Sequence, residues 1–371
     1  MANRPLPVGI ILIAESGGGA AVAIERLIHL LSESSAEVHV LGNALPWIMS
    51  VDVHEHQRVI LPAATPGSLK SGAAALRGGR TLIRTMLAIR RYSHENSDLV
   101  LLPVLTGTAL ATLVATLGLP NPVIVCERND PSRQRHGWHV ELLKRLLYPR
   151  ATAITVNAPS RAARDHLVRV SRGRPVHFVP NPRPKGMAPA DVRSSRVILS
   201  VGRLVPQKNH ATLIEAFAQI HERIPEWSLR IAGDGPLREP LNQLIDRLGL
   251  RQKVELVRHA DDVGQLYASA GLFVLPSDYE GTSNALLEAA SAGLPCIVSE
   301  ETAPPQTACI LMRVPAGSPE ALAARMLEAC TDSDRRAELG LAANRWVHHV
   351  SDDDVLAKWI DVLRSSASEK R

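Results

Sequence analysis

The sequence predicts an α/β protein of two domains, each built on a parallel sheet. Its 371 residues exceed what one core usually holds, because domains commonly contain ~100–200 residues. Short β-branched runs alternate with longer stretches of helical periodicity, and this alternation requires crossover connections. The alternation stops near residues 182–195, which are rich in Pro, Gly, Lys and Ser, and then restarts. We interpret that stretch as a linker.

The expected strands are short apolar runs in both halves. Val8–Ala14 is expected to be the first, and Ala21–Leu31 after it repeats apolar residues at helical spacing. Ser351 and the three aspartates after it are typical of a capped helix start. Ligands bind at the carboxyl ends of strands in such sheets, so a site is expected in a cleft between the two domains. The remaining predicted strands are Val38–Leu41, Leu99–Leu102, Val123–Cys126, Ala153–Val156, Val197–Val201, Ser228–Ala232, Val254–Leu256, Leu272–Leu275 and Cys296–Val298.

Composition favours a cytoplasmic protein. The four cysteines form no C-x-x-C pair and have no histidine at metal-ligand spacing, so we expect mostly buried, reduced thiols. The uncharged stretch Leu99–Val125 is long enough to span a bilayer, but prolines and glycines interrupt it. We therefore interpret it as a strand, a helix of small residues and a second strand.

Charge is distributed unevenly along the chain. Residues 1–190 hold 22 basic and 12 acidic residues, whereas residues 191–371 hold 20 and 25. No zinc, RNP-like or OB-type pattern supports nucleic acid as the partner of the basic half. An anionic membrane surface or a phosphate-bearing acceptor fits it better. Within residues 65–91, a helix would carry Arg84, Arg90 and Arg91 beside apolar residues, which suits either a headgroup layer or a solvated surface.

The stretch Val201–Asn209 places two cations after a predicted strand. Arg203 offers a planar fork and Lys208 a flexible point charge, the combination that a diphosphate needs. Two solvated loop cations are the competing interpretation. A helix, Ala211–Ile220, is predicted to follow.

The stretch Asp278–Ala289 follows another predicted buried strand. Its helix is expected to start near Ser283, and the free N–H groups of that start favour an anion. Glu280 lies in the loop, and Glu288 lies in the helix on the same face as Asn284. Such carboxylates can accept hydrogen bonds from sugar hydroxyls, while a glycoside-hydrolase pair is the rival interpretation.

Two glycine-rich loops carry weaker signals. One contains Gly233, and the other contains Gly18 and Gly19 and would let the backbone approach a ligand closely. The second is not a dinucleotide fingerprint, because Val22 occupies the position of its third glycine. No D-x-D motif lies at a predicted strand end, so no metal site is predicted.

Together these stretches resemble retaining glycosyltransferase family four, which has the GT-B fold. The resemblance is specific over residues 197–298 and looser in the first half, where GGG, VCERNDP and FVPNP carry it. It implies domains at 1–185 and 186–350, with a helix at 351–371 that crosses back to the first. It implies that Arg203 and Lys208 bind the donor diphosphate, that Glu280 contacts the hexose and that Glu288 contacts the ribose. Backbone at Ser283, Asn284 and Ala285 would hold the distal phosphate and sugar, while Gly233, Arg258 and His259 would border the base.

The sequence departs from that pattern in three places. Glu127 stands where many relatives have a histidine near the transferred sugar, and it resembles a variant of lipopolysaccharide- and capsule-type members, so we assign it a catalytic role. The loop after Glu300 is short, and Arg258-His259 replaces a usual glycine.

The resulting expectation is retaining transfer of a hexose from an NDP-sugar, UDP-linked in our prediction, without a metal or other cofactor. The acceptor would be a saccharide or lipid-linked saccharide in cell-surface polysaccharide biosynthesis, at the cytoplasmic face of the membrane. A GT-B sugar-nucleotide epimerase and a non-catalytic nucleotide-sugar-binding partner remain as alternatives.

Overall fold

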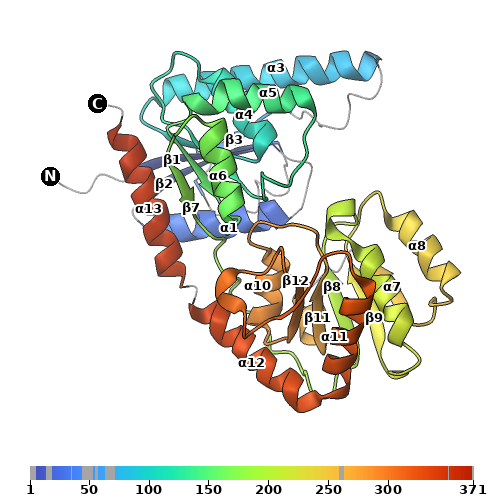
Figure 1. The fold of residues 1–371 in the computed structure, drawn as a ribbon. Helices are drawn as coiled ribbons and strands as arrows, with labels where there is room; N and C mark the ends of the chain where they lie inside the picture. Colours follow the sequence, from blue (N-terminus) through green and yellow to red (C-terminus); the bar gives the residue numbers. More distant parts are fainter. Residues whose placement is uncertain are drawn as a thin grey trace. The chain divides into compact units, whose positions relative to one another are not determined.

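The computed structural model describes residues 6–13, 19–34, 36–43, 53–54, 57–62, 72–258, 263–349 and 351–369. The chain divides into two compact units. Unit 1 comprises Met1–Pro182 and Asp352–Arg371, and unit 2 comprises Arg183–Ser351. The boundaries expected from the sequence, 185/186 and 350/351, lie close to these junctions. Each unit contains one parallel sheet with helices packed on it (Figure 1).

Unit 1 is built on a seven-stranded sheet in the order β3-β2-β1-β4-β5-β6-β7. Every pairing is parallel; Val8, for example, aligns with Val38 on one side and Val100 on the other. The central strands are buried on both faces, as parallel sheets require. The strands are β1 (Leu6–Leu12), β2 (Ala36–Gly42), β3 (Arg58–Ile60), β4 (Val100–Val104), β5 (Ile124–Glu127), β6 (Ala153–Val156) and β7 (Val176–Phe178).

Helices cover both faces of this sheet. On one face α3, α4 and α5 form a layer, and on the other α1 and α13 pack together (Figure 1). The last helix, α13, also contacts β4, so the C-terminal segment is part of unit 1. The helices are α1 (Gly19–Ser32), α3 (Gly72–Glu95), α4 (Thr106–Ala115), α5 (Trp138–Leu147), α6 (Arg161–Val170) and α13 (Asp352–Ser368), with a 3₁₀ turn at Tyr148–Arg150.

The uncharged stretch Leu99–Val125 forms β4, α4 and the start of β5, as predicted. Its helix is buried through threonine and alanine side chains, which let it pack closely on the sheet. Across the described ranges, no helix combines the length and apolar character needed to cross a bilayer.

Unit 2 is built on a six-stranded parallel sheet in the order β10-β9-β8-β11-β12-β13. The strands are β8 (Val197–Val201), β9 (Ser228–Ala232), β10 (Val254–Val257), β11 (Leu272–Leu275), β12 (Cys296–Ser299) and β13 (Met312–Val314). The helices are α7 (His210–Ile220), α8 (Arg238–Arg247), α9 (Val263–Ala268), α10 (Asn284–Ser291), α11 (Pro319–Thr331) and α12 (Ser333–His349), with 3₁₀ turns at Pro206–Lys208 and Pro305–Thr307.

Three strands have no counterpart among the sequence predictions: β3, β7 and β13. Each has three residues and lies at the edge of its sheet. The last lies in the segment after Glu300, where the sequence suggested only a short loop. Met312 aligns with Ile297 there, and the Glu300 amide donates to the Val314 carbonyl at 2.8 Å.

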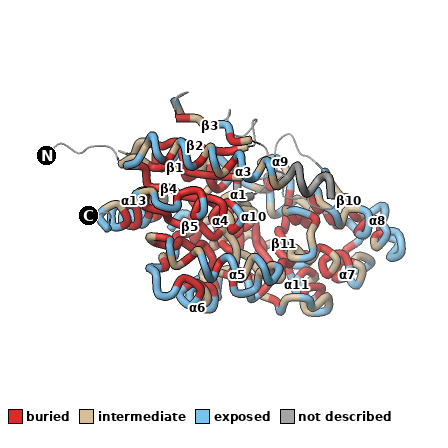
Figure 2. The backbone as a smooth tube through the Cα atoms, turned by 90° about the horizontal axis from the view of Figure 1, so that it is seen from above, coloured by how far each residue is buried: buried red, intermediate tan, exposed pale blue. Residues whose placement is uncertain are grey.

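The cores are mainly aliphatic, and burial follows the sheets (Figure 2). Cys126, Cys296 and Cys330 are buried, as expected, whereas Cys309 is exposed. Burial raises the pKa of the Cys330 thiol to about 12 and that of Cys296 higher still, so both are protonated thiols at neutral pH.

Candidate nucleotide-sugar site

Unit 2 places Arg203, Lys208 and Glu280 beyond the carboxyl ends of its central strands. β8 and β11 are parallel neighbours, so their carboxyl ends lie side by side. Arg203 and Lys208 follow β8, and Glu280 follows β11. The two motifs, separated by about 70 residues of sequence, are thereby brought together.

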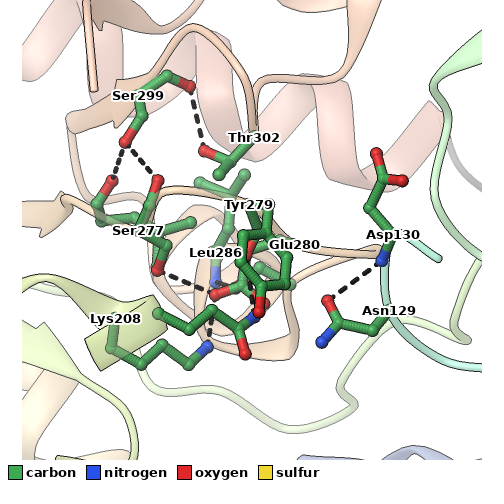
Figure 3. A network of polar contacts seen from close by, with 12 residues as sticks. Asn129, Asp130, Lys208, Ser277, Tyr279, Glu280, Leu286, Ser299 and Thr302 are labelled. Atoms are coloured by element: carbon green, nitrogen blue, oxygen red, sulfur yellow. Dashed lines mark hydrogen bonds and ion pairs between the residues drawn. The ribbon is translucent and has the colours of Figure 1, made fainter. Parts of the chain in front are cut away.

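Lys208 and Glu280 form an ion pair through Nζ and Oε1 (Figure 3). The hydroxyl of Ser277 donates to the same carboxylate oxygen at 2.8 Å. The side chains of Lys208 and Glu280 are only 16% and 9% exposed, so solvent screens the pair weakly. The arrangement holds a lysine ammonium and a carboxylate at fixed positions at the end of the sheet.

Backbone and amide contacts join the loops that carry this pair. Gln207 donates from Nε2 to the Tyr279 carbonyl at 2.8 Å, and the Asp278 amide donates to the Gln207 carbonyl at 2.9 Å. Asn209 donates from Nδ2 to Asp278 Oδ1 at 2.8 Å, and its own backbone has a φ of 48°. Asparagine tolerates this left-handed conformation better than most residues. The two loops therefore hold each other in place.

Arg203 is exposed and has no ion pair with any residue in the described ranges. Its loop packs against the glycine-rich loop after β9. A Cβ atom at Gly233 would lie 1.9 Å from the Gly202 carbonyl oxygen, so only glycine allows this approach. The Leu204 amide also donates to the Asp234 carbonyl at 2.9 Å.

Helix α10 begins beside this cluster. Ser283 is its N-cap, and its hydroxyl accepts from the Leu286 amide, while Asn284 and Ala285 form the first turn. Glu288, half-buried one turn further along, accepts a hydrogen bond at Oε2 from the hydroxyl of Tyr267 at 2.8 Å. The predicted helix start and the placement of Glu288 in the helix are thus observed.

Asp234 organises the charges at the ends of β9 and β10. Arg238 donates to its Oδ1 at 3.0 Å, and Arg258 lies 3.6 Å from its Oδ2. The hydrogen bond from Arg238, then that from the Gly235 amide, lowers the pKa of Asp234. Arg258 and Gly233, both predicted to border a base, lie at neighbouring strand ends, whereas His259 is outside the described residues.

His210 is buried at the start of α7, directly behind the cation loop. Burial, and next the charge of Lys208, lowers the pKa of its imidazole to about 4. The ring is therefore neutral at pH 7 and adds no charge beside Lys208.

In unit 1, Glu127 ends β5 and is 2% exposed. Thr106 donates to both carboxylate oxygens, at 3.2 and 3.1 Å, and the buried hydroxyl of Tyr148 donates to Oε1. Burial, and next the charge of Glu127, raises the pKa of Tyr148 well above its usual value. Glu127, which we predicted to be catalytic, thus accepts hydrogen bonds from two residues of its own unit. Gly18 lies outside the described residues, and Gly19 begins α1.

Several residues of the site were not anticipated from the sequence. Ser277 and Tyr267, which bind the two glutamates, carry no motif of their own. Asn209 and Asp278 are adjacent to predicted residues, and their polarity at loop positions was the available signal.

Two units, each with one parallel sheet and helices packed on it, define the GT-B fold class. HepE of Anabaena, solved in complex with UDP and glucose, has this architecture; its TM-score is 0.78 at 15% identity, with 97% of this chain and 100% of that chain covered. Residues 189–346 match the family described as glycosyl transferases group 1. This match lies within unit 2 and confirms the resemblance seen in the sequence.

Curated relatives share parts of the chain. An exopolysaccharide phosphotransferase of Streptomyces coelicolor is 28% identical over 274 residues, which are 72% of this chain and 29% of that protein. A UDP-Gal:α-D-GlcNAc-diphosphoundecaprenol α-1,3-galactosyltransferase of Escherichia coli is 42% identical over 111 residues, 29% of this chain and 28% of that protein. The chain thus spans less than a third of the length of either relative.

Proposed function

We propose that the protein is a retaining glycosyltransferase that moves a hexose from an NDP-sugar, UDP-linked in our proposal, to a saccharide or lipid-linked saccharide. The Lys208–Glu280 ion pair carries the proposal, because it joins a cation suited to a phosphate and a carboxylate suited to sugar hydroxyls at the carboxyl ends of neighbouring strands. The match of residues 189–346 to glycosyl transferases group 1 supports it, as do the relatives named as an exopolysaccharide phosphotransferase and a diphosphoundecaprenol-sugar galactosyltransferase.

The donor diphosphate would bind Arg203 and Lys208. Arg203 is exposed and offers two N–H groups in a fork, while Lys208 is already oriented by Glu280. Pairing with Lys208 also neutralises Glu280, so the carboxylate repels a diphosphate less. Its second oxygen can then accept from a hexose hydroxyl. Both cations would stabilise the diphosphate as negative charge develops on it.

Transfer with retention would proceed from one face of the sugar. The acceptor hydroxyl forms the new bond to the anomeric carbon while the bond from that carbon to the phosphate oxygen breaks. The hydroxyl proton passes to an oxygen of the leaving diphosphate, so no separate protein base is required. The α10 N-terminus, capped by Ser283, would hold the distal phosphate.

Glu288 would bind the ribose hydroxyls. It lies in α10, where a hydrogen bond from the Tyr267 hydroxyl orients its carboxylate, whereas Glu280 lies in the loop before that helix. Glu288→Gln should weaken UDP or GDP binding, and Glu280→Gln should mainly slow sugar transfer. Isothermal titration with both nucleotides separates the two effects. Equal nucleotide affinity of wild type and Glu288→Gln would exclude the ribose role.

Unit 1 would receive the acceptor. Its surplus of basic residues suits a phosphate-bearing acceptor, and α3 carries exposed arginines beside exposed apolar side chains. We therefore propose peripheral association with the inner face of the plasma membrane. Arg90, one residue of the predicted basic set, donates from Nη1 to the Ala115 and Leu117 carbonyls, so it links α3 to the end of α4.

The direct test is a panel of UDP- and GDP-sugars, with nucleoside diphosphate release followed in the presence and absence of membrane extract. Release that requires an acceptor, with a glycosidic product of retained configuration by NMR, is the expected result. Interconversion of the sugar nucleotide without any acceptor would indicate an epimerase instead. Donor binding with no turnover would indicate a non-catalytic partner.

A further inference from the structure

Helix α5 has an unusual distribution of side chains. Lys144 is fully buried, with Nζ 3.5 Å from Glu141 Oε1 and 5.8 Å from the ring centroid of the buried Tyr148. The opposite face exposes Trp138, Leu142 and Leu146, which recur every four residues and so form one stripe. A helix that packs only on a core would bury its tryptophan and leucines and expose its lysine.

Exposed apolar side chains also lie on the neighbouring helices. α4 contacts both α3 and α5 and lies between them in the layer that Figure 2 views from above. Trp138 is 80% exposed, far more than any other large apolar side chain in the described ranges. Many exposed apolar side chains on one layer of helices are typical of an interaction site. The exposed apolar side chains of the layer are Leu82, Ile83, Leu87, Val114, Leu117, Trp138, Leu142, Leu143 and Leu146.

Charge indicates what covers this face. Within residues 79–150, the exposed carboxylates are Glu95, which pairs with Arg91, and Asp98, both at the C-terminal end of α3. The exposed arginines of the same segment are Arg80, Arg84, Arg90, Arg91, Arg133, Arg135, Arg145 and Arg150. Exposed leucines and a tryptophan among cations, almost without acids, complement a layer of anionic headgroups over acyl chains.

We propose that the α3–α4–α5 layer docks on an anionic lipid bilayer, with Trp138, Leu142 and Leu146 of α5 inserted at the headgroup boundary. Tryptophan suits this depth because its ring is apolar and its N–H remains near water. This inference rests on the proposed transfer to a lipid-linked acceptor and specifies which surface of unit 1 meets the membrane.

Vesicles of phosphatidylglycerol and phosphatidylcholine in equal parts provide the test. Leu142→Ser with Leu146→Ser should weaken vesicle partition of the full chain about tenfold or more, because apolar burial is lost. Leu248→Ser with Leu341→Ser is the matched control, since both of these leucines are exposed in unit 2. The control should bind as wild type does. Arg80→Ser with Arg84→Ser should remove much of the salt-sensitive part of binding.

Tryptophan emission reports the insertion itself. Trp47 lies outside the described residues, so the measurement uses protein that carries Trp47→Phe. Trp227, Trp346 and Trp359 are buried, whereas Trp138 is exposed, so the emission of Trp138 should shift to the blue on vesicles. Adding Trp138→Phe should abolish that shift yet keep most of the binding. Wild-type partition without an emission shift, or unchanged binding by the double leucine variant, would overturn the proposal. The proposal would also be overturned if the wild type formed a dimer, the double leucine variant were a monomer, and neither protein bound vesicles.

Transferase activity separates this inference from the proposed function. With a water-soluble saccharide acceptor, the double leucine variant should turn over at the wild-type rate. Loss of vesicle binding with retained turnover therefore bears on the docking surface alone. Vesicle binding by a protein that consumes no sugar nucleotide would instead reject the proposed function and leave the surface in place.

Discussion

Both units end a central parallel strand near a glutamate, yet the two carboxylates have different surroundings. Glu280 in unit 2 pairs with a lysine from another loop and stays at the edge of the sheet. Glu127 in unit 1 is enclosed by Thr106 and Tyr148, which belong to the helix and turn packed on its own strand. A glutamate at or after the carboxyl end of a central strand can thus be held either by a cation from a neighbouring loop or by hydroxyls of its own unit. The partners decide between these cases.

The largest expected effect is on the unit 2 pair. Lys208→Ala should lower kcat/KM by an amount equivalent to about 3 kcal/mol of transition-state stabilisation or more, because the proposed phosphate contact is lost and the largely buried Glu280 is left without its cation. Arg203→Ala should cost at least ~2 kcal/mol. Steady-state kinetics with the active donor measures both. Lys185→Ala, at an exposed lysine of the same unit, is the control. Wild-type turnover by Lys208→Ala with normal circular dichroism would contradict the diphosphate assignment.

The next largest effect concerns the stability of unit 2, which contains a buried and neutral histidine, His210. The pKa of His210 is about 4 in the fold against 6.5 for the free side chain, so only the unfolded chain binds a proton between these values. The free energy of unfolding should therefore fall as pH drops from 6.5 to 4, by up to about 3 kcal/mol from this group.

Urea unfolding of the full chain at several pH values measures this loss. His210→Gln should flatten the dependence between pH 6.5 and 4, while the exposed His139→Gln should leave it as in wild type. An unchanged slope in His210→Gln would show that this buried imidazole does not control acid stability.

The sequence predicts the central strands of both sheets but not their edge strands. Buried central strands such as Leu272–Leu275 are continuous apolar runs bounded by turns, so their positions could be predicted. The edge strands β3, β7 and β13 have three residues each and depend on a neighbouring strand for their hydrogen bonds, so no local pattern marks them.

The residues of the candidate site also differ in how far the sequence predicts them. The motif residues Arg203, Lys208 and Glu280 could be selected because their charge follows a strand, and the structure places all three at one sheet edge. Tyr267 and Tyr148, which bind Glu288 and Glu127, come from segments with no polar motif, and only the fold brings them there. Long-range side-chain pairs of this kind have no signal in the local sequence.

A smaller effect decides between the two roles of Glu127. Glu127→Gln should lower the free energy of unfolding by about 2 kcal/mol, because the new amide N–H₂ is buried against hydroxyls that already donate. Tyr148→Phe should destabilise similarly. UDP affinity, measured by calorimetry, should not change in either variant, since the residues proposed to bind the nucleotide lie in unit 2. A stable Glu127→Gln variant that binds UDP but transfers no sugar would assign the residue to the reaction instead.

The smallest expected effect is that of metal removal, and it tests whether the unit 2 cations suffice. The sequence has no D-x-D motif at a predicted strand end, and the carboxylates near the described site are engaged: Asp234 by Arg238, Asp278 by Asn209 and Glu280 by Lys208. Arg203 and Lys208 would supply the positive charge that a divalent ion provides in other transferases.

EDTA should therefore change kcat by less than about twofold, since the charge on the leaving diphosphate is met by side chains that EDTA does not remove. The measurement is nucleoside diphosphate release with and without EDTA, followed by addition of Mn²⁺ in excess. Lys208→Ala offers an internal comparison, because a metal added to that variant could partly replace the lost cation. Complete loss of wild-type turnover in EDTA, with full recovery on Mn²⁺, would show that the lysine–arginine pair is not sufficient.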